Sequence, residues 1–167
     1  MNISWLKIPV FCALLIGLGS GVQAADCKLP ANATELAADA GRQMNARRKR
    51  AGLKALLVDA KLAAAAMAHA CDMSRQGYFS HQGKDGSTHS TRLKNQGCRP
   101  RIAAENIAAG HTDAKHLIKR WMASKGHRRN ILMQRGVDRY GVGLAHSGKA
   151  FSHGFVWVML FSSDCQR

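Results

Sequence analysis

The sequence is 167 residues long and carries 25 Lys or Arg against 10 Asp or Glu, which gives a formal net charge of +15 at pH 7. This length predicts one domain, and the charge favours anionic partners such as lipid head groups, cell-wall polymers or lipopolysaccharide. Solubility alone is the simpler interpretation of the charge. Aromatic residues make up only 6% of the chain, too few for the stacking platform that binds single-stranded nucleic acid, so nucleic acid is not an expected partner.

The first 24 residues are typical of a secretory signal peptide. Lys7 precedes the apolar run Ile8–Leu18, and small residues follow at the positions needed for cleavage before Ala25. The apolar run is shorter than the roughly 20 residues that span a bilayer, although an N-terminal anchor is the alternative. We therefore expect a single domain over residues 25–167 that is secreted or periplasmic, monomeric, and without a transmembrane segment after cleavage.

Four cysteines remain after cleavage: Cys27, Cys71, Cys98 and Cys165. An even count in an exported chain predicts disulfides, and four cysteines allow three pairings. A zinc site of four thiolates is disfavoured, because no two of them lie two to four residues apart. We expect Cys71–Cys98, which are separated by one helix and one loop, and Cys27–Cys165, because the termini of a compact domain are often close.

Four helices are expected in the first part of the chain, each between a capping side chain and a glycine. The expected caps are Asn32 (with Glu35 as its reciprocal partner), Asp59, Ser87 and Thr112, and the helices end near Gly52, Gly77, Gly97 and Gly126. One further turn is expected over Arg128–Met133. The fourth helix has the clearest amphipathic pattern, with apolar residues at 114, 117, 118, 121 and 122.

The first of these helices ends in a run of four cations, Arg47–Arg50. Cations at a helix C-terminus interact favourably with the helix dipole. The run is therefore interpreted either as a solvated helix end or, more specifically, as a patch that binds heparin-like polymers or nucleic acid.

The end of the chain is strand-like over Tyr140–Ala145 and Phe151–Phe161, with a turn at residues 147–149. In the second strand, apolar side chains alternate between two faces: Phe155, Trp157, Met159 and Phe161 on one, and Val156, Val158 and Leu160 on the other. A strand that is apolar on both faces must be covered on both. This predicts an α+β fold, a three-layer α-β-α sandwich with a small, mostly antiparallel central sheet.

Polar side chains that could carry chemistry stand in three segments, Tyr78–Gly86, Ala104–Gly110 and Trp121–Leu132. Glu105 is one of only two glutamates and lies among Ile and Ala residues, so its carboxylate must be paired or have a raised pKa. A structural glutamate that binds a loop is the alternative. His81 and His127 each follow a small residue in an expected turn, a position that is equally common for a surface histidine.

The ordered motifs Tyr-Phe-Ser-His, Ala-Glu-Asn-Ile-Ala and Trp-Met-x-Ser-x-Gly-His-Arg-x-Asn-Ile-Leu resemble the bacterial branch of the CAP superfamily over about residues 40–161. The resemblance implies the same α-β-α sandwich, with a large open cavity lined by two histidines and two acidic residues. The histidines correspond to His81 and His127 and the first acid to Glu105. The second acid corresponds to Ser124, which puts in doubt any mechanism that needs two carboxylates, although Asp85 could substitute in space.

The resemblance implies a non-catalytic binding module that presents His81, Glu105, Ser124 and His127 to a lipid, glycan or protein partner. The alternative is a metal-assisted peptidase or esterase, with Zn²⁺ held by His81 and His127 and with Glu105 or Ser124 as the catalytic candidates. No His-Glu-x-x-His or Gly-x-Ser-x-Gly motif supports a named hydrolase class. A third hypothesis is a protein that binds an anionic envelope component mainly through charge.

Overall fold

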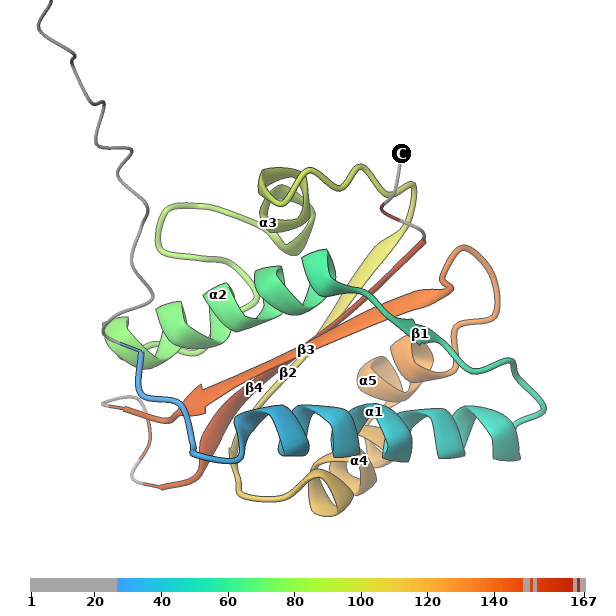
Figure 1. The fold of residues 1–167 in the computed structure, drawn as a ribbon, viewed down its shortest axis with the longest axis horizontal. Coiled ribbons are helices and arrows are strands. Elements are labelled where there is room, and N and C mark those ends of the chain that lie inside the picture. The colour runs from blue at the N-terminus through green and yellow to red at the C-terminus, as the bar shows by residue number, and fades with distance from the viewer. Residues whose placement is uncertain (1–26, 149–150, 152, 164, 166–167) are drawn as a thin grey trace, which may run out of the picture.

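A computed structural model describes residues 27–148, 151, 153–163 and 165. The predicted signal peptide and its cleavage site lie outside these residues. The elements are α1 (Ala33–Arg50), β1 (Leu57–Val58), α2 (Ala60–Gln76), α3 (His89–Asn95), β2 (Ala103–His111), α4 (Ala114–Ala123), α5 (Lys125–Ile131), β3 (Arg139–His146) and β4 (Phe155–Ser162). Figure 1 shows the sheet between two helical layers, with α2 and α3 on one side and α1, α4 and α5 on the other.

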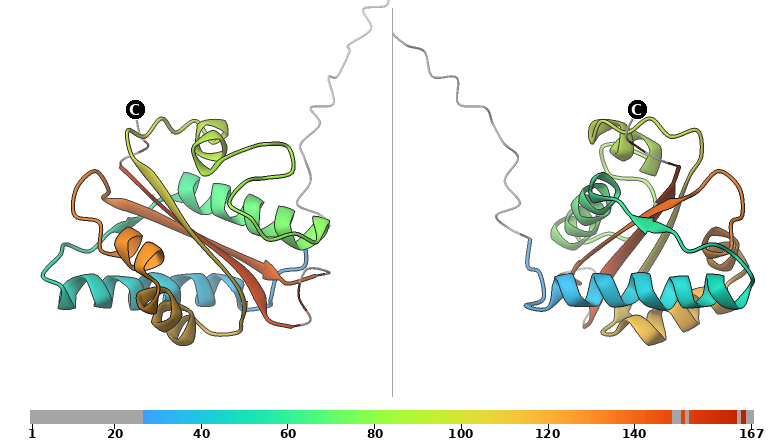
Figure 2. Two further views of the ribbon diagram at one scale, coloured as in Figure 1. Left: turned by 180° about the vertical axis from the view of Figure 1, so that it is seen from behind. Right: turned by 45° about the vertical axis from the view of Figure 1, so that its right-hand side comes forward.

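The sheet has the strand order β1-β3-β4-β2. Only the two-residue pairing of β1 with β3 is parallel, whereas β3–β4 and β2–β4 are antiparallel. The predicted three-layer sandwich with a mostly antiparallel sheet is therefore confirmed. The rear view in Figure 2 shows that β2 is an edge strand and that α4 and α5 lie beside it.

The two faces of β4 contribute to two separate cores, as its alternation predicts. Trp157, Met159 and Phe161 pack with α1 and α4. Val156, Val158 and Leu160 pack with α2 and α3. All six side chains are completely buried, and each buried large apolar side chain contributes about 1.5–3 kcal/mol. The strand therefore joins the two halves of the molecule.

Two glycines of β3 allow α2 to lie directly against the sheet. A Cβ atom added at Gly141 would lie 2.1 Å from the backbone nitrogen of Ala63, and one added at Gly143 would lie 2.2 Å from that of Met67. Both distances are far below van der Waals contact. Larger residues at these positions would have to push the helix away from the strand.

The predicted boundaries are correct for α2, and the predicted start of α1 after Asn32 is also correct. Asp59 caps α2 through the N–H groups of Lys61 and Leu62, and Gly77 ends it in the left-handed conformation. Asn32 precedes α1 as predicted but makes no side-chain capping bond.

The predicted caps of α3 and α4 are each wrong by one residue. Thr88 rather than Ser87 caps α3, and Asp113 rather than Thr112 caps α4. In both cases the next residue along the chain also has a side-chain acceptor, and it is that residue whose backbone is extended. Gly126 does not end α4, because the break comes at Ser124 and the glycine lies inside α5.

The disulfides join Cys27 to Cys71 and Cys98 to Cys165, so the predicted pairing is wrong. The reason is the direction of the strands. The N-terminal segment lies beside the end of β3, where the Lys28 carbonyl oxygen accepts a hydrogen bond from the His146 amide. The chain leaves β4 at the opposite end of the sheet, because β3 and β4 are antiparallel. Cys27 therefore lies next to Cys71, and Cys165 lies next to Cys98.

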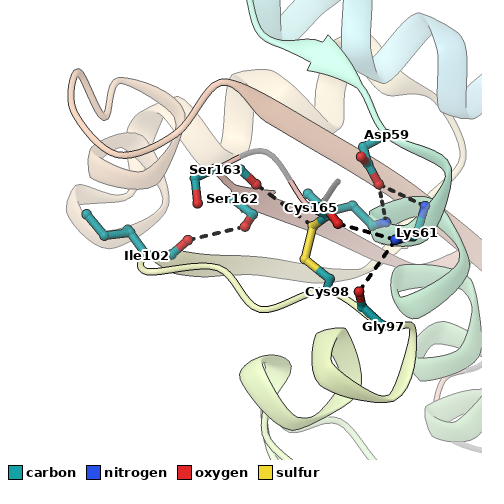
Figure 3. Close-up of a disulfide and its surroundings, with 9 residues drawn as sticks. Asp59, Lys61, Gly97, Cys98, Ile102, Ser162, Ser163 and Cys165 are labelled. Carbon is teal, nitrogen blue, oxygen red and sulfur yellow. Dashed lines mark hydrogen bonds between the residues drawn. A yellow bond between two sulfur atoms is a disulfide. The ribbon is translucent and has the colours of Figure 1, made fainter. Parts of the chain in front are cut away.

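The Cys98–Cys165 disulfide fixes the C-terminal segment next to the turn after α3 (Figure 3). The ammonium group of Lys61 donates to the carbonyl oxygens of Gly97 and Cys165, at 3.4 and 3.2 Å. The same segment is fixed to the start of β2 by Ser162, whose hydroxyl donates to Ile102 O. These contacts hold the first residues of β2, and hence Glu105, in register.

Candidate functional site

The candidate site lies along the edge strand β2. Successive side chains of a strand point to opposite faces of the sheet. Glu105 pairs across the ladder with Leu160, which packs with α2 and α3, whereas the next residue, Asn106, pairs with Met159 on the other face. The site therefore extends around the free edge of the sheet, with one part on each face.

The first part is a cluster of Glu105, Arg92 and His81. Arg92 on α3 donates from Nη2 to Glu105 Oε2 at 2.7 Å, and His81 Nδ1 lies 2.8 Å from Glu105 Oε1. The side chain of Glu105 is 1% exposed and that of Arg92 is 9% exposed, whereas that of His81 is 56% exposed. Both oxygens of a buried carboxylate are thus engaged, and only the histidine reaches the solvent.

The electrostatics of the cluster keep Glu105 ionised. Burial alone would raise the pKa of its carboxyl group, but the hydrogen bond from His81 and the charge of Arg92 outweigh burial and lower the pKa below its ordinary value. An ionised carboxylate can only accept hydrogen bonds. The proton of a neutral His81 must therefore be on Nδ1, which leaves Nε2 as an acceptor or metal ligand at the solvent-exposed side of the ring.

Two buried side chains, Arg92 and His69, hold the loop that carries His81. Arg92 also donates to the carbonyl oxygens of His81 and Ser87, at 3.0 and 3.1 Å. His69, which is 1% exposed, lies 2.9 Å from Ser80 O through Nε2. Burial lowers the pKa of His69, so a neutral ring donates to this carbonyl. The backbone on both sides of the His81 side chain is therefore held by α2 and α3.

The second part of the site comes from α5. Asn130 Nδ2 donates to Glu105 O at 3.2 Å and to Asn106 Oδ1 at 2.9 Å, and Asn106 Nδ2 donates to His127 O at 3.1 Å. These bonds fix α5 to the outer edge of β2 and satisfy an edge carbonyl that would otherwise face water. Burial lowers the pKa of His127, and the charge of His81 lowers it further. Both effects favour the neutral form of the His127 imidazole.

Ser124 and Asp85 have local roles. Ser124 is the junction between α4 and α5, where its carbonyl oxygen accepts from the Arg128 amide, and its side chain makes no capping bond within the described structure. Asp85 is exposed and accepts from the Ser87 amide at 2.9 Å, in its own loop. Among the described residues, Asp85 binds its own loop and makes no hydrogen bond to the cluster of Glu105, Arg92 and His81, so it does not replace the missing second carboxylate.

The donor set fits a metal site of two imidazoles at most. Catalytic zinc sites use three protein ligands and keep one open position. In the described part of the chain, no group of three His, Cys, Asp or Glu side chains is placed to hold a metal ion. Glu105 is already bound by Arg92 and His81. It can orient a liganding imidazole, as carboxylates beside metal-binding histidines do, but it is not itself free.

An apolar hollow lies at the opposite edge of the sheet. It has a volume of about 510 Å³ and is formed between α1, the start of α2 and the first half of β3, with Leu29, Ala37, Val58, Met67 and Val142 among its lining residues. Leu29 and Val58 are exposed by 44% and 68%. Such a lining suits an apolar segment of a ligand rather than an ion.

Three residues of the site are not predicted from the sequence: Arg92, Asn106 and Asn130. The two asparagines stand in the motifs that carry the family resemblance, so their position was visible but their role was not. Arg92 is one of 25 basic residues. The only available signal was that a buried Glu105 requires a cation, and that signal does not select which one.

The comparisons with known proteins agree with this architecture. The sequence profile of the cysteine-rich secretory protein family, CAP, matches residues 42–161. The chain belongs to the CAP family. The matched range covers most of the chain and includes all four predicted site residues, so the resemblance seen in the motifs is confirmed.

Two curated relatives from Bacillus subtilis (strain 168) match this chain over 112 residues, or 67% of its length. The uncharacterized protein YkwD is 37% identical over 43% of its own length, and the uncharacterized membrane protein YlbC is 30% identical over 32% of its length. This chain therefore spans less than half the length of these relatives, and the activity of a whole relative does not transfer to it.

Solved structures show the same fold. An extracellular protein containing an SCP domain from Bacillus anthracis str. Ames superposes with a TM-score of 0.69 at 28% identity, over 79% of this chain and 41% of that protein. A cysteine-rich secretory protein from Staphylococcus aureus subsp. aureus Mu50 gives 0.64 at 19% identity, over 80% and 40%, which supports the fold alone. In the described residues of this CAP domain, no helix is long and apolar enough to cross a membrane.

Proposed function

We propose that this CAP domain is a secreted or periplasmic binding module whose recognition residue is His81. The observation that carries the proposal is the complete engagement of Glu105, whose two carboxylate oxygens are bound by Arg92 and by His81 Nδ1. A buried ion pair fixes the imidazole from behind, and the ring is 56% exposed. The carboxylate therefore prepares the histidine for contact with a partner.

The same observation disfavours hydrolysis by Glu105. A general base must accept a proton from the attacking group, and its pKa should be near the working pH. The pKa of Glu105 is instead lowered by its two partners. The Ser124 side chain makes no capping bond at the start of α5, and no contact within the described residues activates its hydroxyl as a nucleophile.

The chemistry of a neutral imidazole defines the ligand group. Nε2 of His81 can accept a hydrogen bond from a hydroxyl or amide, which glycans, lipid head groups and proteins all offer. We expect a partner in the cell envelope or outside the cell that presents such a donor.

The test is co-sedimentation of labelled protein with three envelope fractions: lipid vesicles, delipidated cell-wall glycan and solubilised envelope protein. The matched control is His116→Ala, because His116 is also an exposed histidine whose Nδ1 lies 2.8 Å from a carboxylate, that of Asp113. We expect His81→Ala to weaken binding to one fraction about ten-fold, or about 1.4 kcal/mol, and His116→Ala to leave it unchanged. Equal binding of both variants would contradict the proposal, as would turnover of peptide or ester substrates that His81→Ala abolishes.

A second candidate function is metal binding, which the Glu105–His81 contact favours because metal-binding histidines usually donate their other N–H to a carboxylate. His81 and His127 would hold Zn²⁺, which would supply an activated water when bound. Calorimetry with Zn²⁺ at about pH 7.5, where free imidazole is neutral, tests this. Uptake that persists in His116→Ala and disappears in the His81→Ala/His127→Ala variant is the expected result. No uptake by the wild-type protein would exclude it.

A further inference from the structure

We infer that the adjoining ends of α1 and α5 form a second binding surface, one that fits an anionic polysaccharide. The surface consists of five cations in the last turns of these two helices: Arg47, Lys49, Arg50, Arg128 and Arg129. It is separate from His81, which lies in the loop after α2. The sequence left two interpretations of the run Arg47–Arg50 open, and the arrangement of the two helix ends decides between them.

A buried arginine brings the two helix ends together. Arg48 is 2% exposed, although it stands in the middle of the basic run. Its Nη1 donates to Ile131 O at 2.7 Å and to Met133 O at 2.8 Å, and its Nε donates to Lys54 O at 2.9 Å. The guanidinium group therefore joins the end of α1 to the end of α5. The two helix ends that carry the five cations therefore lie next to each other.

The charge of this surface is not neutralised within the described structure. None of the five cations takes part in an ion pair among the described residues. The acids of α1, Glu35 and Asp39, stand in its first half, and α5 contains none. The helix dipole accounts for about 0.3–1 kcal/mol per cation in the last turn. These five cations have no carboxylate partner among the described residues, so their charge is available to an external anion.

The composition favours a hydrophilic polyanion over a membrane. Four of the five cations are arginines, whose planar guanidinium groups bind carboxylate, sulfate and phosphate with two hydrogen bonds. Peripheral membrane binding normally adds apolar side chains that enter the lipid. The exposed large apolar residues of the described chain are Leu29, Leu57, Val58, Phe79 and Ile102, and none belongs to α1 or α5. A polysaccharide with regularly spaced anionic groups is the partner that matches these features.

The experiment compares two variants of equal net charge. One removes four charges from the surface: Lys49→Gln, Arg50→Gln, Arg128→Gln and Arg129→Gln. The other removes four exposed charges elsewhere: Lys28→Gln, Arg75→Gln, Lys94→Gln and Arg99→Gln. Binding of a labelled heparin-derived dodecasaccharide, used as a model polyanion, is measured by fluorescence anisotropy between about 0.05 and 0.5 M salt. Circular dichroism verifies that both variants are folded.

We expect the surface variant to bind at least about ten-fold more weakly at low salt, with a salt slope reduced by about one for each cation that no longer pairs with the polymer. The control variant should lose less than about two-fold, and His81→Ala should bind like the wild type. Equal losses in both four-charge variants would show that net charge alone holds the polymer and would overturn the inference. Binding to anionic phospholipid vesicles that is stronger and falls in the surface variant alone would also overturn it, in favour of a membrane.

Discussion

The buried pair of Arg92 and Glu105 should couple strongly in a double-mutant cycle. The two side chains are 9% and 1% exposed, and their charged atoms lie 2.7 Å apart. Removing one partner of such a pair leaves an uncompensated buried charge, which costs about 3–5 kcal/mol, whereas replacing both can be nearly neutral. We therefore expect Arg92→Met and Glu105→Gln each to lower the free energy of unfolding by about 3 kcal/mol, and the double variant to lower it by at least about 2 kcal/mol less than the sum.

The assay is equilibrium unfolding in urea, followed by tryptophan fluorescence with the disulfides intact. A loss below about 1 kcal/mol in either single variant is typical of a surface pair and would refute the account of the cluster. The pH dependence gives a second readout. Because the folded-state pKa of Glu105 is lowered, its contribution is complete above its unfolded pKa of about 4.3 and is lost as the pH falls below that value. Glu105→Gln should remove this part of the acid limb.

The other predictions concern stability. Replacing Cys98 and Cys165 by Ala opens a disulfide that spans 67 residues and should lower the free energy of unfolding by about 4 kcal/mol; a non-reducing peptide map that lacks this link would contradict the structure. Gly143→Ala should cost about 3 kcal/mol or more in urea unfolding, because its Cβ would meet the backbone of α2. Burial lowers the folded-state pKa of His69, so the unfolded chain takes up this proton first and stability should fall as the pH drops below about 6.5; His69→Gln should flatten that slope, and an unchanged slope would exclude His69 as its source.

The parts of the fold that the sequence predicts are those specified by local pattern. The alternation along β4 fixes which side chains enter each core, and both faces are buried as expected. The start of α2 after Asp59 and its end at Gly77 are predicted correctly, because a capping side chain and a left-handed glycine are local signals. The strand β2 was not predicted, since Glu105 and Asn106 interrupt its apolar run at the site itself. The two-residue β1 is too short for any pattern to indicate.

The features that could not be predicted from the sequence depend on how distant segments meet. The cysteine pairing follows from the antiparallel direction of β3 and β4, which places Cys27 and Cys165 at opposite ends of the sheet. The partner of Glu105 is a cation on α3 that no spacing rule distinguishes from the others. Arg48 is similar, because a buried arginine in a basic run is indistinguishable by sequence from its exposed neighbours.

The measurement that tests the central claim most directly is the ¹⁵N resonance of the His81 side chain, with and without a soluble fragment of the envelope fraction that binds. In its neutral form the ring of the free protein should show a protonated Nδ1 and a bare Nε2, because an ionised Glu105 can only accept. Addition of the fragment should shift the Nε2 resonance of His81 and leave that of His116 in place. A bound protein whose His81 resonances do not move would contradict the claim that this histidine recognises the partner.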